Sequence, residues 1–201
     1  MITIGWLCLV CLVVGSHAYP GGAPEGACGH MTPSHGGSVA KALSTSPFSL
    51  TLSANSYLPG DKITVTINGT DTSFKGILLQ ARAAGDKAEG WWDKPERDLY
   101  KRLNCGGETN SAVTHINPND KLTPQSFVWI APCNSTMDYT FYATVVQEYT
   151  EFYVKIPSTM VTRQLGNKEC KPPGSRGSAN SLLPLWTTIV IMIVHLMALL
   201  R

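Results

Sequence analysis

Residues 137–158 read MDYTFYATVVQEYTEFYVKIPS and are dense in aromatic and β-branched side chains. Such residues favour strands, because their side chains pack well on a pleated, half-buried surface. The stretch is too long for one ordinary strand. We therefore predict two strands, bent or turned around residues 147–151, and an all-β fold.

Working outward from this stretch, the same signals recur along the chain. Residues 47–54, PFSLTLSA, and residues 62–69, KITVTING, alternate apolar and polar side chains, which is typical of half-buried strands. Residues 73–84, SFKGILLQARAA, are almost continuously apolar at their centre and predict a central strand. Residues 125–132, QSFVWIAP, predict another strand that stops at Pro132. Six or more short strands without a helical period indicate a β-sandwich.

Three other regions lack the strand pattern. Residues 19–37, YPGGAPEGACGHMTPSHGG, predict an irregular arm that is attached to the body through Cys28. Between Ala84 and Thr123 we expect a long loop region with one short strand near residues 112–115. Residues 171–181, KPPGSRGSANS, have the composition of a flexible stalk.

The amino-terminal end has the features of a secretory signal. Residues 1–18 form an apolar core of suitable length and end in small residues, so we predict cleavage after Ala18. The mature chain then holds Cys28, Cys105, Cys133 and Cys170. An even number of cysteines in a secreted chain predicts two disulfides, with three pairings open. The sequons at Asn68 and Asn134 predict N-glycosylation.

The carboxyl-terminal run, residues 182–201, reads LLPLWTTIVIMIVHLMALLR. Small residues, a short polar spacer and a terminal apolar tail together match a signal for a glycosylphosphatidylinositol (GPI) anchor, whose tail is removed. We expect attachment at Ser175, with Gly174 and Ser178 as alternatives. A single membrane-spanning segment is the alternative, because the apolar run is close to the minimum length that crosses a bilayer.

Several separated blocks carry a family resemblance. Residues 19–37, FKGILLQAR at 74–82, FVWIAP at 127–132 and YTFYATVVQEYTEFYVKI at 139–156 together resemble the Reeler (reelin) domain, in the same order. The resemblance extends over residues 19–170, essentially the whole mature chain. It implies an immunoglobulin-like antiparallel β-sandwich with two disulfides.

By the same resemblance, Cys28 pairs with Cys105 and Cys133 pairs with Cys170. The first bridge would tie the arm to the long loop region, and the second would fasten the end of a strand to the chain exit. Each closed loop is long, so a chain-entropy estimate gives roughly 3–5 kcal/mol per bridge as an upper figure.

Reeler domains occur in several kinds of protein, and the kind implies the function. Small members resemble insect defence proteins, which are linked to antibacterial responses. Larger members join the domain to haem-binding ferric-reductase modules, or to matrix and neuronal guidance proteins. This chain has room for one such domain, so the resemblance favours defence over reductase activity. The apolar tail distinguishes it from simply secreted defence proteins.

The segment GWWDKPERDLYKR, residues 90–102, is the candidate ligand-binding feature. Tryptophan rings can stack on sugars, and cations can attract anionic groups. A microbial surface polymer or a sulfated glycan would suit this combination. In the alternative interpretation, the tryptophans cover the edge of the sandwich, and the charged side chains belong to an ordinary solvent-exposed surface. The candidate residues are Trp91, Trp92, Lys94, Arg97, Lys101 and Arg102.

Other chemistry receives less support from the sequence. His30 and His35 are close in the arm, but a metal site would need a third ligand such as His115. No nucleophile lies in a hydrolase-type context such as G-x-S-x-G. The formal net charge of +2 does not indicate nucleic-acid binding. We therefore expect no enzyme activity, no metal and no cofactor.

The sequence predicts a glycosylated, disulfide-bonded domain that reaches the outer face of the plasma membrane through the secretory pathway, or is released from it. Recognition of microbes in innate immunity is the leading hypothesis. Adhesion through sulfated glycans and an accessory role in iron reduction are the alternatives.

Overall fold

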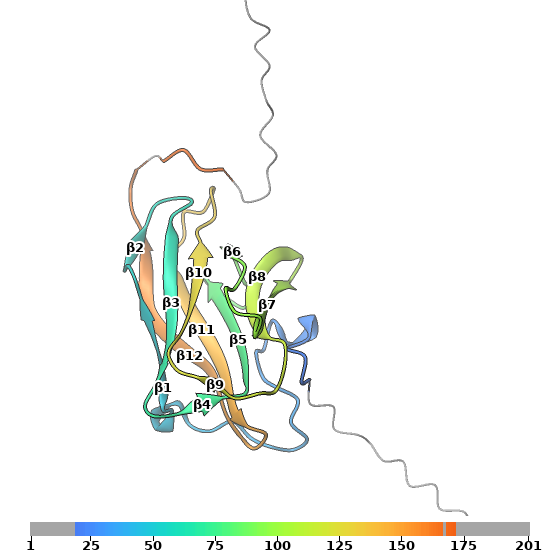
Figure 1. Cartoon of the computed structure of the whole chain (residues 1–201). Helices are drawn as coiled ribbons and strands as arrows, with labels where there is room; N and C mark the ends of the chain where they lie inside the picture. The colour runs from blue at the N-terminus through green and yellow to red at the C-terminus, as the bar shows by residue number, and fades with distance from the viewer. Residues whose placement is uncertain (1–18, 167, 172–201) are drawn as a thin grey trace, which may run out of the picture.

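The predicted strands build two sheets that lie face to face (Figure 1). The computed structural model describes residues 19–166 and 168–171. One sheet has the strand order β1-β3-β10-β6, and the other has the order β2-β12-β11-β5-β8-β7. A short antiparallel pair, β4-β9, lies at one end of the sandwich (Figure 1).

The described residues form strands at every stretch that carries a strand signal and also at several stretches that carry none. The strands are β1 Phe48–Leu52, β2 Ser56–Tyr57, β3 Lys62–Gly69, β4 Ser73–Phe74, β5 Gly76–Arg82, β6 Trp91–Trp92, β7 Tyr100–Cys105, β8 Glu108–His115, β9 Lys121–Leu122, β10 Gln125–Ile130, β11 Tyr139–Glu148 and β12 Glu151–Arg163. Two single 3-10 turns, Glu25–Ala27 and Leu43–Thr45, precede β1.

Residues 137–158 form two strands, as predicted. β11 and β12 pair antiparallel, with Glu148 opposite Glu151 across the turn. β11 also pairs with β5, so it lies in the interior of the six-stranded sheet. The dense aromatic and β-branched content of this stretch thus supplies neighbouring strands near the centre of the larger sheet.

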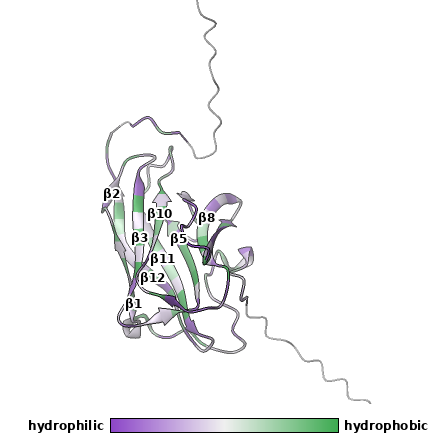
Figure 2. Ribbon diagram, viewed as in Figure 1, coloured by the Kyte–Doolittle hydropathy of each residue, from purple (hydrophilic) through white to green (hydrophobic). Residues whose placement is uncertain are grey.

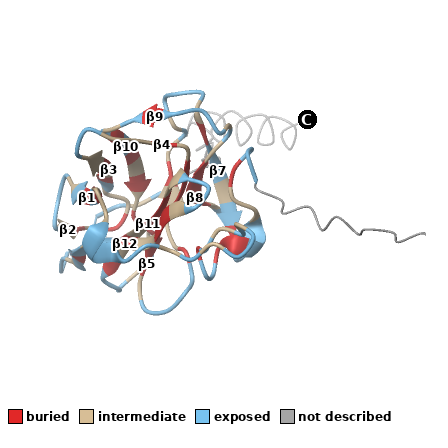
Figure 3. Cartoon of the chain, turned by 90° about the horizontal axis from the view of Figure 1, so that it is seen from below, coloured by how far each residue is buried: buried red, intermediate tan, exposed pale blue. Residues whose placement is uncertain are grey.

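The main core lies between the two sheets. In β3, Ile63, Val65 and Ile67 are each at most 1 % exposed, while the threonines between them face outward. Figure 2 shows the apolar residues concentrated on the strands, and Figure 3 shows the buried residues gathered where the sheets meet. The alternation that was visible in the sequence therefore orients each strand toward this core.

β5 is buried along its whole length, because it contributes to two cores. Ile77 and Leu79 point into the core between the sheets. Leu78 points to the opposite face and packs with Ala27 and Met31 of the arm in a second, smaller core. The arm therefore covers the outer face of the six-stranded sheet, and a central strand was correctly predicted here.

The prediction for residues 84–123 was largely wrong, because this region contains four strands rather than one. β7 and β8 form a hairpin whose tight turn is Gly106–Gly107. Both glycines have positive φ angles, 59° and 82°, which a two-residue hairpin turn of this kind requires. The exposed polar residues of β7 and the first half of β8 hid the strand pattern, although the Gly-Gly pair is itself a hairpin signal.

Several predictions lie outside the described residues. They concern the signal segment 1–18, the anchor residue Ser175, most of the stalk and the tail 182–201. Among the residues that the structure describes, no helix is both long enough and apolar enough to cross a membrane.

Candidate ligand-binding site

The tryptophans of the predicted binding segment face different environments. Trp92 is 1 % exposed, its indole N–H donates to the Ser111 carbonyl at 3.1 Å, and its ring meets the Phe141 ring edge-on. Trp92 was therefore wrongly predicted as a ligand residue. It is a core residue, because β6 pairs with the edge of β10 and directs this side chain between the sheets. Trp91 is half-buried and remains partly accessible.

The cations of this segment do not form one patch. Lys94 and Arg97 are exposed in the loop between β6 and β7. Lys101 and Arg102 are consecutive residues of β7, so their side chains point to opposite faces of the sheet. Within residues 19–166 and 168–171, none of the four forms an ion pair.

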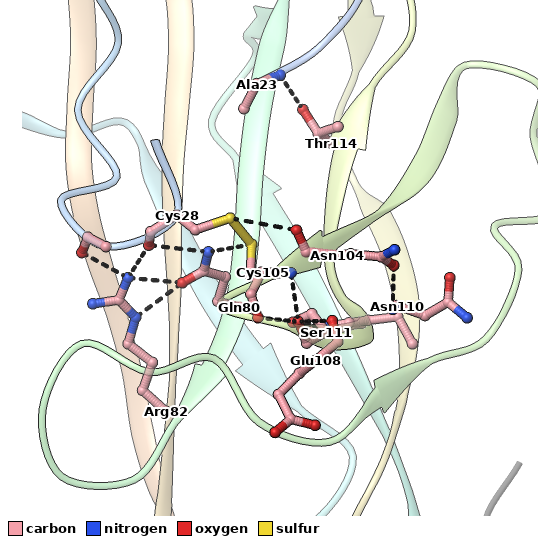
Figure 4. Close-up of a disulfide and its surroundings, with 12 residues drawn as sticks. Ala23, Cys28, Gln80, Arg82, Asn104, Cys105, Glu108, Asn110, Ser111 and Thr114 are labelled. Atoms are coloured by element: carbon pink, nitrogen blue, oxygen red, sulfur yellow. Dashed lines mark hydrogen bonds between the residues drawn. A yellow bond between two sulfur atoms is a disulfide. The ribbon is translucent and has the colours of Figure 1, made fainter. Parts of the chain in front are cut away.

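The arm is fixed to the sheet by a covalent bond. Cys28 and Cys105 form a disulfide with a Cα–Cα distance of 5.5 Å (Figure 4), so the pairing implied by the family resemblance is confirmed. Gln80 lies beside this bridge, and its amide donates to the Cys28 carbonyl at 3.2 Å. The bridge thus holds the arm against β5 and β7.

A buried guanidinium reinforces the same contact. Arg82 is 2 % exposed and donates to the main-chain carbonyls of Cys28 and Gly29 and to the Gln80 side chain (Figure 4). Its fourth partner is the exposed Asp86 carboxylate at 2.7 Å. Burial lowers the pKa of Arg82, and the charge of Asp86 opposes that shift. The guanidinium therefore crosslinks the arm to β5 through hydrogen bonds.

Further hydrogen bonds hold the arm against the outer face of the six-stranded sheet. The Ala23 N–H donates to the Thr114 hydroxyl at 2.8 Å, and the Thr144 hydroxyl donates to the Met31 carbonyl at 2.8 Å. Gly22 passes so close to β8 that a Cβ there would lie 2.3 Å from the His115 carbonyl oxygen. Only glycine permits this approach.

A groove of about 250 Å³ remains between the arm and the sheet. At its rim the Lys75 ammonium pairs with the Glu148 carboxylate at 2.6 Å. An apolar groove with a few polar groups at its rim is the usual form of a small-ligand site. Its apolar lining comes from the arm and from strands β5 and β11, and includes Ala23, Met31, Ile77, Leu78 and Val146.

Two histidines border the groove, but each has a local role. The His115 Nδ1 accepts a hydrogen bond from the Ile77 N–H at 3.1 Å, and burial lowers the pKa of this ring. His35 stacks on the Tyr149 ring with 4.6 Å between centroids. Among the described residues, no three His, Cys, Asp or Glu side chains gather in a way that would hold a metal ion.

The second disulfide lies at another part of the molecule. Cys133 and Cys170 are joined with a Cα–Cα distance of 5.4 Å, again in the pairing implied by the resemblance. Asn134, the next residue after Cys133, is exposed. Asn68 is half-buried near the end of β3, where its amide donates to the Thr51 hydroxyl at 2.9 Å. Glycosylation at both asparagines stays a prediction.

Comparison with known sequences agrees with this architecture. Residues 26–169 match the model of the Reeler domain. "Putative defense protein 3" of Antheraea mylitta is 42 % identical over 147 residues, covering 72 % of this chain and 86 % of that protein. "Putative ferric-chelate reductase 1" of Xenopus laevis is 36 % identical over 157 residues, which cover 76 % of this chain but only 25 % of that protein.

Solved structures show the same fold. The human F-spondin reeler domain superposes with a TM-score of 0.52 at 20 % identity, covering 64 % of this chain and 96 % of that domain. The Reelin-N domain of F-spondin gives the same TM-score at 21 % identity, covering 64 % of this chain and 93 % of that domain. The sandwich carries both disulfides, and residues 26–169 match the family model. This chain therefore belongs to the Reeler domain family.

Proposed function

We propose that this protein is an extracellular recognition domain of innate defence, and that its groove binds the apolar part of a microbial surface molecule. The observation that supports the defence setting is the match along 86 % of a relative named as a defence protein. The groove supports the kind of ligand, because its apolar lining matches an acyl chain better than a polar saccharide.

The energetics of burial favour such a ligand. Each methylene that leaves water for an apolar groove contributes about 0.8 kcal/mol. The arm that forms one wall is already held by a disulfide and by the Arg82 hydrogen bonds, so little ordering cost remains for binding. The Lys75–Glu148 pair at the rim places charges beside the point where a polar head group would emerge.

The test compares acylated bacterial wall polymers with the same polymers after chemical deacylation, by titration against the full-length protein. Binding of the acylated form alone is the expected result. Replacing Val146 with Trp should fill the groove and weaken binding about tenfold. Val128→Trp is the matched control, since Val128 is a half-buried valine on β10 of the other sheet. Equal binding of both polymer forms would exclude the groove as the site.

Binding to anionic glycans is a second candidate function. It is favoured by Lys94, Arg97, Lys101 and Arg102, none of which forms an ion pair within the described residues. A heparin column separates the candidates. Lys94→Ala with Arg97→Ala should lower the eluting salt concentration more than Lys101→Ala alone, because the first two share one loop. Elution without retention would exclude this function.

The iron-reduction alternative depends on the longer relatives. The chain spans 25 % of the ferric-chelate reductase relative from Xenopus laevis, so the activity named for that protein is not carried over to this chain. Purified protein with an absorption band in the visible range would support this alternative.

Display on the outer cell surface is part of the same proposal. A lipid anchor attached at Ser175 is expected to be released by phosphatidylinositol-specific phospholipase C. Retention on the cell after this treatment would favour a single span through residues 182–200 instead.

A further inference from the structure

The rim of the groove beneath the arm carries one cation and one anion. Among the described residues that line this groove, Lys75 and Glu148 are the only charged ones besides two histidines. The Lys75 ammonium donates to both oxygens of the Glu148 carboxylate, at 2.6 and 2.7 Å. The two side chains are 36 % and 56 % exposed, so each keeps accessible surface for a ligand. The rim therefore has no net charge but a strong local separation of charge.

The main chain that carries the cation is held on both sides. The Lys75 N–H donates to the Val146 carbonyl at 2.8 Å, and the Lys75 carbonyl accepts from the Lys121 ammonium at 2.9 Å. Lys121 is 1 % exposed and also donates to the Asn117 carbonyl at 2.8 Å. Its ammonium thus ties Lys75 to the loop that contains Pro118, another residue of the groove lining. Because this corner of the groove is already ordered, binding pays little additional entropy there.

Aromatic rings border the same rim. Tyr149 follows Glu148 directly, in the turn between β11 and β12, and is 39 % exposed. Its ring stacks on His35, which holds it beside the groove. Tyr19, at the start of the arm, also lines the groove and is 48 % exposed. Aromatic faces next to a carboxylate attract quaternary ammonium groups.

Charge complementarity distinguishes the classes of head group that could lie at this rim. A head group with a single charge meets one attractive and one repulsive partner, because Lys75 and Glu148 lie within hydrogen-bond distance of each other. A phosphate linked to an ammonium carries both charges and can lie antiparallel to the pair, so that each charge meets its opposite. An uncharged sugar gains neither contact. The rim therefore favours a zwitterion.

We propose that the groove binds amphiphiles with a zwitterionic head group, whose phosphate contacts Lys75 and whose quaternary ammonium contacts Glu148 and Tyr149. The apolar chain lies in the groove, and the head group lies at its rim. This inference rests on the proposed function, since it names the head group of the ligand whose chain fills the groove.

The test compares amphiphiles that share one dodecyl chain and differ in the head group. Each is titrated against the full-length protein by calorimetry, below the concentration at which it forms micelles. Dodecylphosphocholine is expected to bind more tightly than dodecanoate, dodecyltrimethylammonium or dodecyl glucoside. Equal binding of all probes, or tighter binding of any other probe, would overturn the head-group inference and leave the groove in place. Absence of binding by every probe would overturn the groove as well.

Glu148→Gln gives a sharper measurement, because it predicts a gain as well as a loss. The variant leaves Lys75 without its carboxylate, so the rim becomes positive. Dodecylphosphocholine should bind about fivefold more weakly and dodecanoate about fivefold more tightly. Glu151→Gln is the matched control, because Glu151 stands opposite Glu148 across the turn but does not line the groove. A loss of affinity for both probes would overturn the assignment of Glu148.

The aromatic contact is tested separately at Tyr149. Tyr149→Leu should weaken dodecylphosphocholine binding about threefold, whereas Tyr149→Phe keeps the ring and should preserve it. Dodecanoate has no ammonium, so it should bind both variants and the unaltered protein with the same affinity. Equal affinity of Tyr149→Leu and the unaltered protein for dodecylphosphocholine would overturn the role given to this ring.

Discussion

Arg82 illustrates how one buried side chain fixes a segment that has little core of its own. Its guanidinium satisfies the carbonyls of Cys28 and Gly29, which belong to the arm rather than to a strand. In Arg82→Met the Gly29 carbonyl loses this donor, and the buried Cys28 carbonyl keeps only the Gln80 amide. We expect the free energy of unfolding to fall by about 2–3 kcal/mol, because hydrogen bonds from a charged donor are lost, measured by denaturant unfolding. Lys87→Met, which breaks the exposed pair with Glu108, should cost less than about 1 kcal/mol.

His115 predicts a pH dependence of stability. Burial lowers its pKa below the ordinary value of 6.5, and the nearby Lys121 acts in the same direction, while donation from the protonated ring to the Ile77 carbonyl opposes it. The unfolded chain therefore binds a proton at a pH where the folded chain does not. The stability from neutral His115 is complete above the unfolded pKa and declines as the pH falls toward the folded pKa.

Melting temperatures measured from about pH 7.5 down to about pH 5.5 should thus decrease. His115→Gln should flatten this decrease, because it removes the titrating ring. His30→Gln is the control, since His30 is exposed and its hydrogen bonds are confined to Thr32 among the described residues. Parallel curves for His115→Gln and the unaltered protein would contradict the interpretation.

For single residues, the sequence predicted the role correctly where that role follows from the local pattern of apolar and polar side chains. The apolar positions of β3 were assigned correctly because alternation alone decides which side is buried. Trp92 was assigned wrongly, because its burial depends on a pairing with β10 that lies far along the chain.

Among the elements, β6 has an effect out of proportion to its length. It contains only Trp91 and Trp92, yet it extends the four-stranded sheet and places an indole in the main core. Trp92→Ala should lower the free energy of unfolding by about 3–5 kcal/mol, as large-to-small core substitutions do. Trp91→Ala, a matched change on the half-buried side, should cost clearly less. Equal losses in chemical denaturation would show that both rings are core.

The β7–β8 hairpin shows why an element can escape detection. Lys101, Arg102 and Asn104 are exposed because β7 is the edge strand of its sheet. Polar edge strands discourage association between sheets, but they also remove the alternation on which strand prediction depends. The Gly106–Gly107 turn was the usable signal. β5, by contrast, was predicted as central because both of its faces are apolar.

On the scale of the whole molecule, the sandwich and both disulfides agree with expectation, whereas the position of the arm does not follow from its sequence. Residues 19–37 have no periodicity that could indicate a partner surface. Their contacts arise from a covalent bond, from Arg82 and from a second core whose other half belongs to β5 and β8. The groove depends on that docking, so it was not predicted.

The two disulfides should therefore differ in their effect on function. They close loops with sequence separations of 77 and 37 residues, and the chain-entropy model assigns about 4 kcal/mol to each. Cys28→Ser with Cys105→Ser should loosen the arm, raise its amide hydrogen exchange and abolish binding in the groove. Cys133→Ser with Cys170→Ser should reduce stability but preserve the affinity of the folded fraction. Equal loss of affinity in both pairs would contradict this assignment.

The Cys133–Cys170 bridge also has a consequence for orientation. Cys170 packs on Gly60, beside the end of the sandwich where the Tyr139 hydroxyl meets Ser135 and β11 begins. β11 then runs to Glu148, at the rim of the groove, over roughly 30 Å for a strand of this length. Figure 1 shows the chain leaving at the end far from this rim. A tether attached beyond Lys171 would present the groove to the surroundings, with the length of the sandwich as the spacer between surface and ligand.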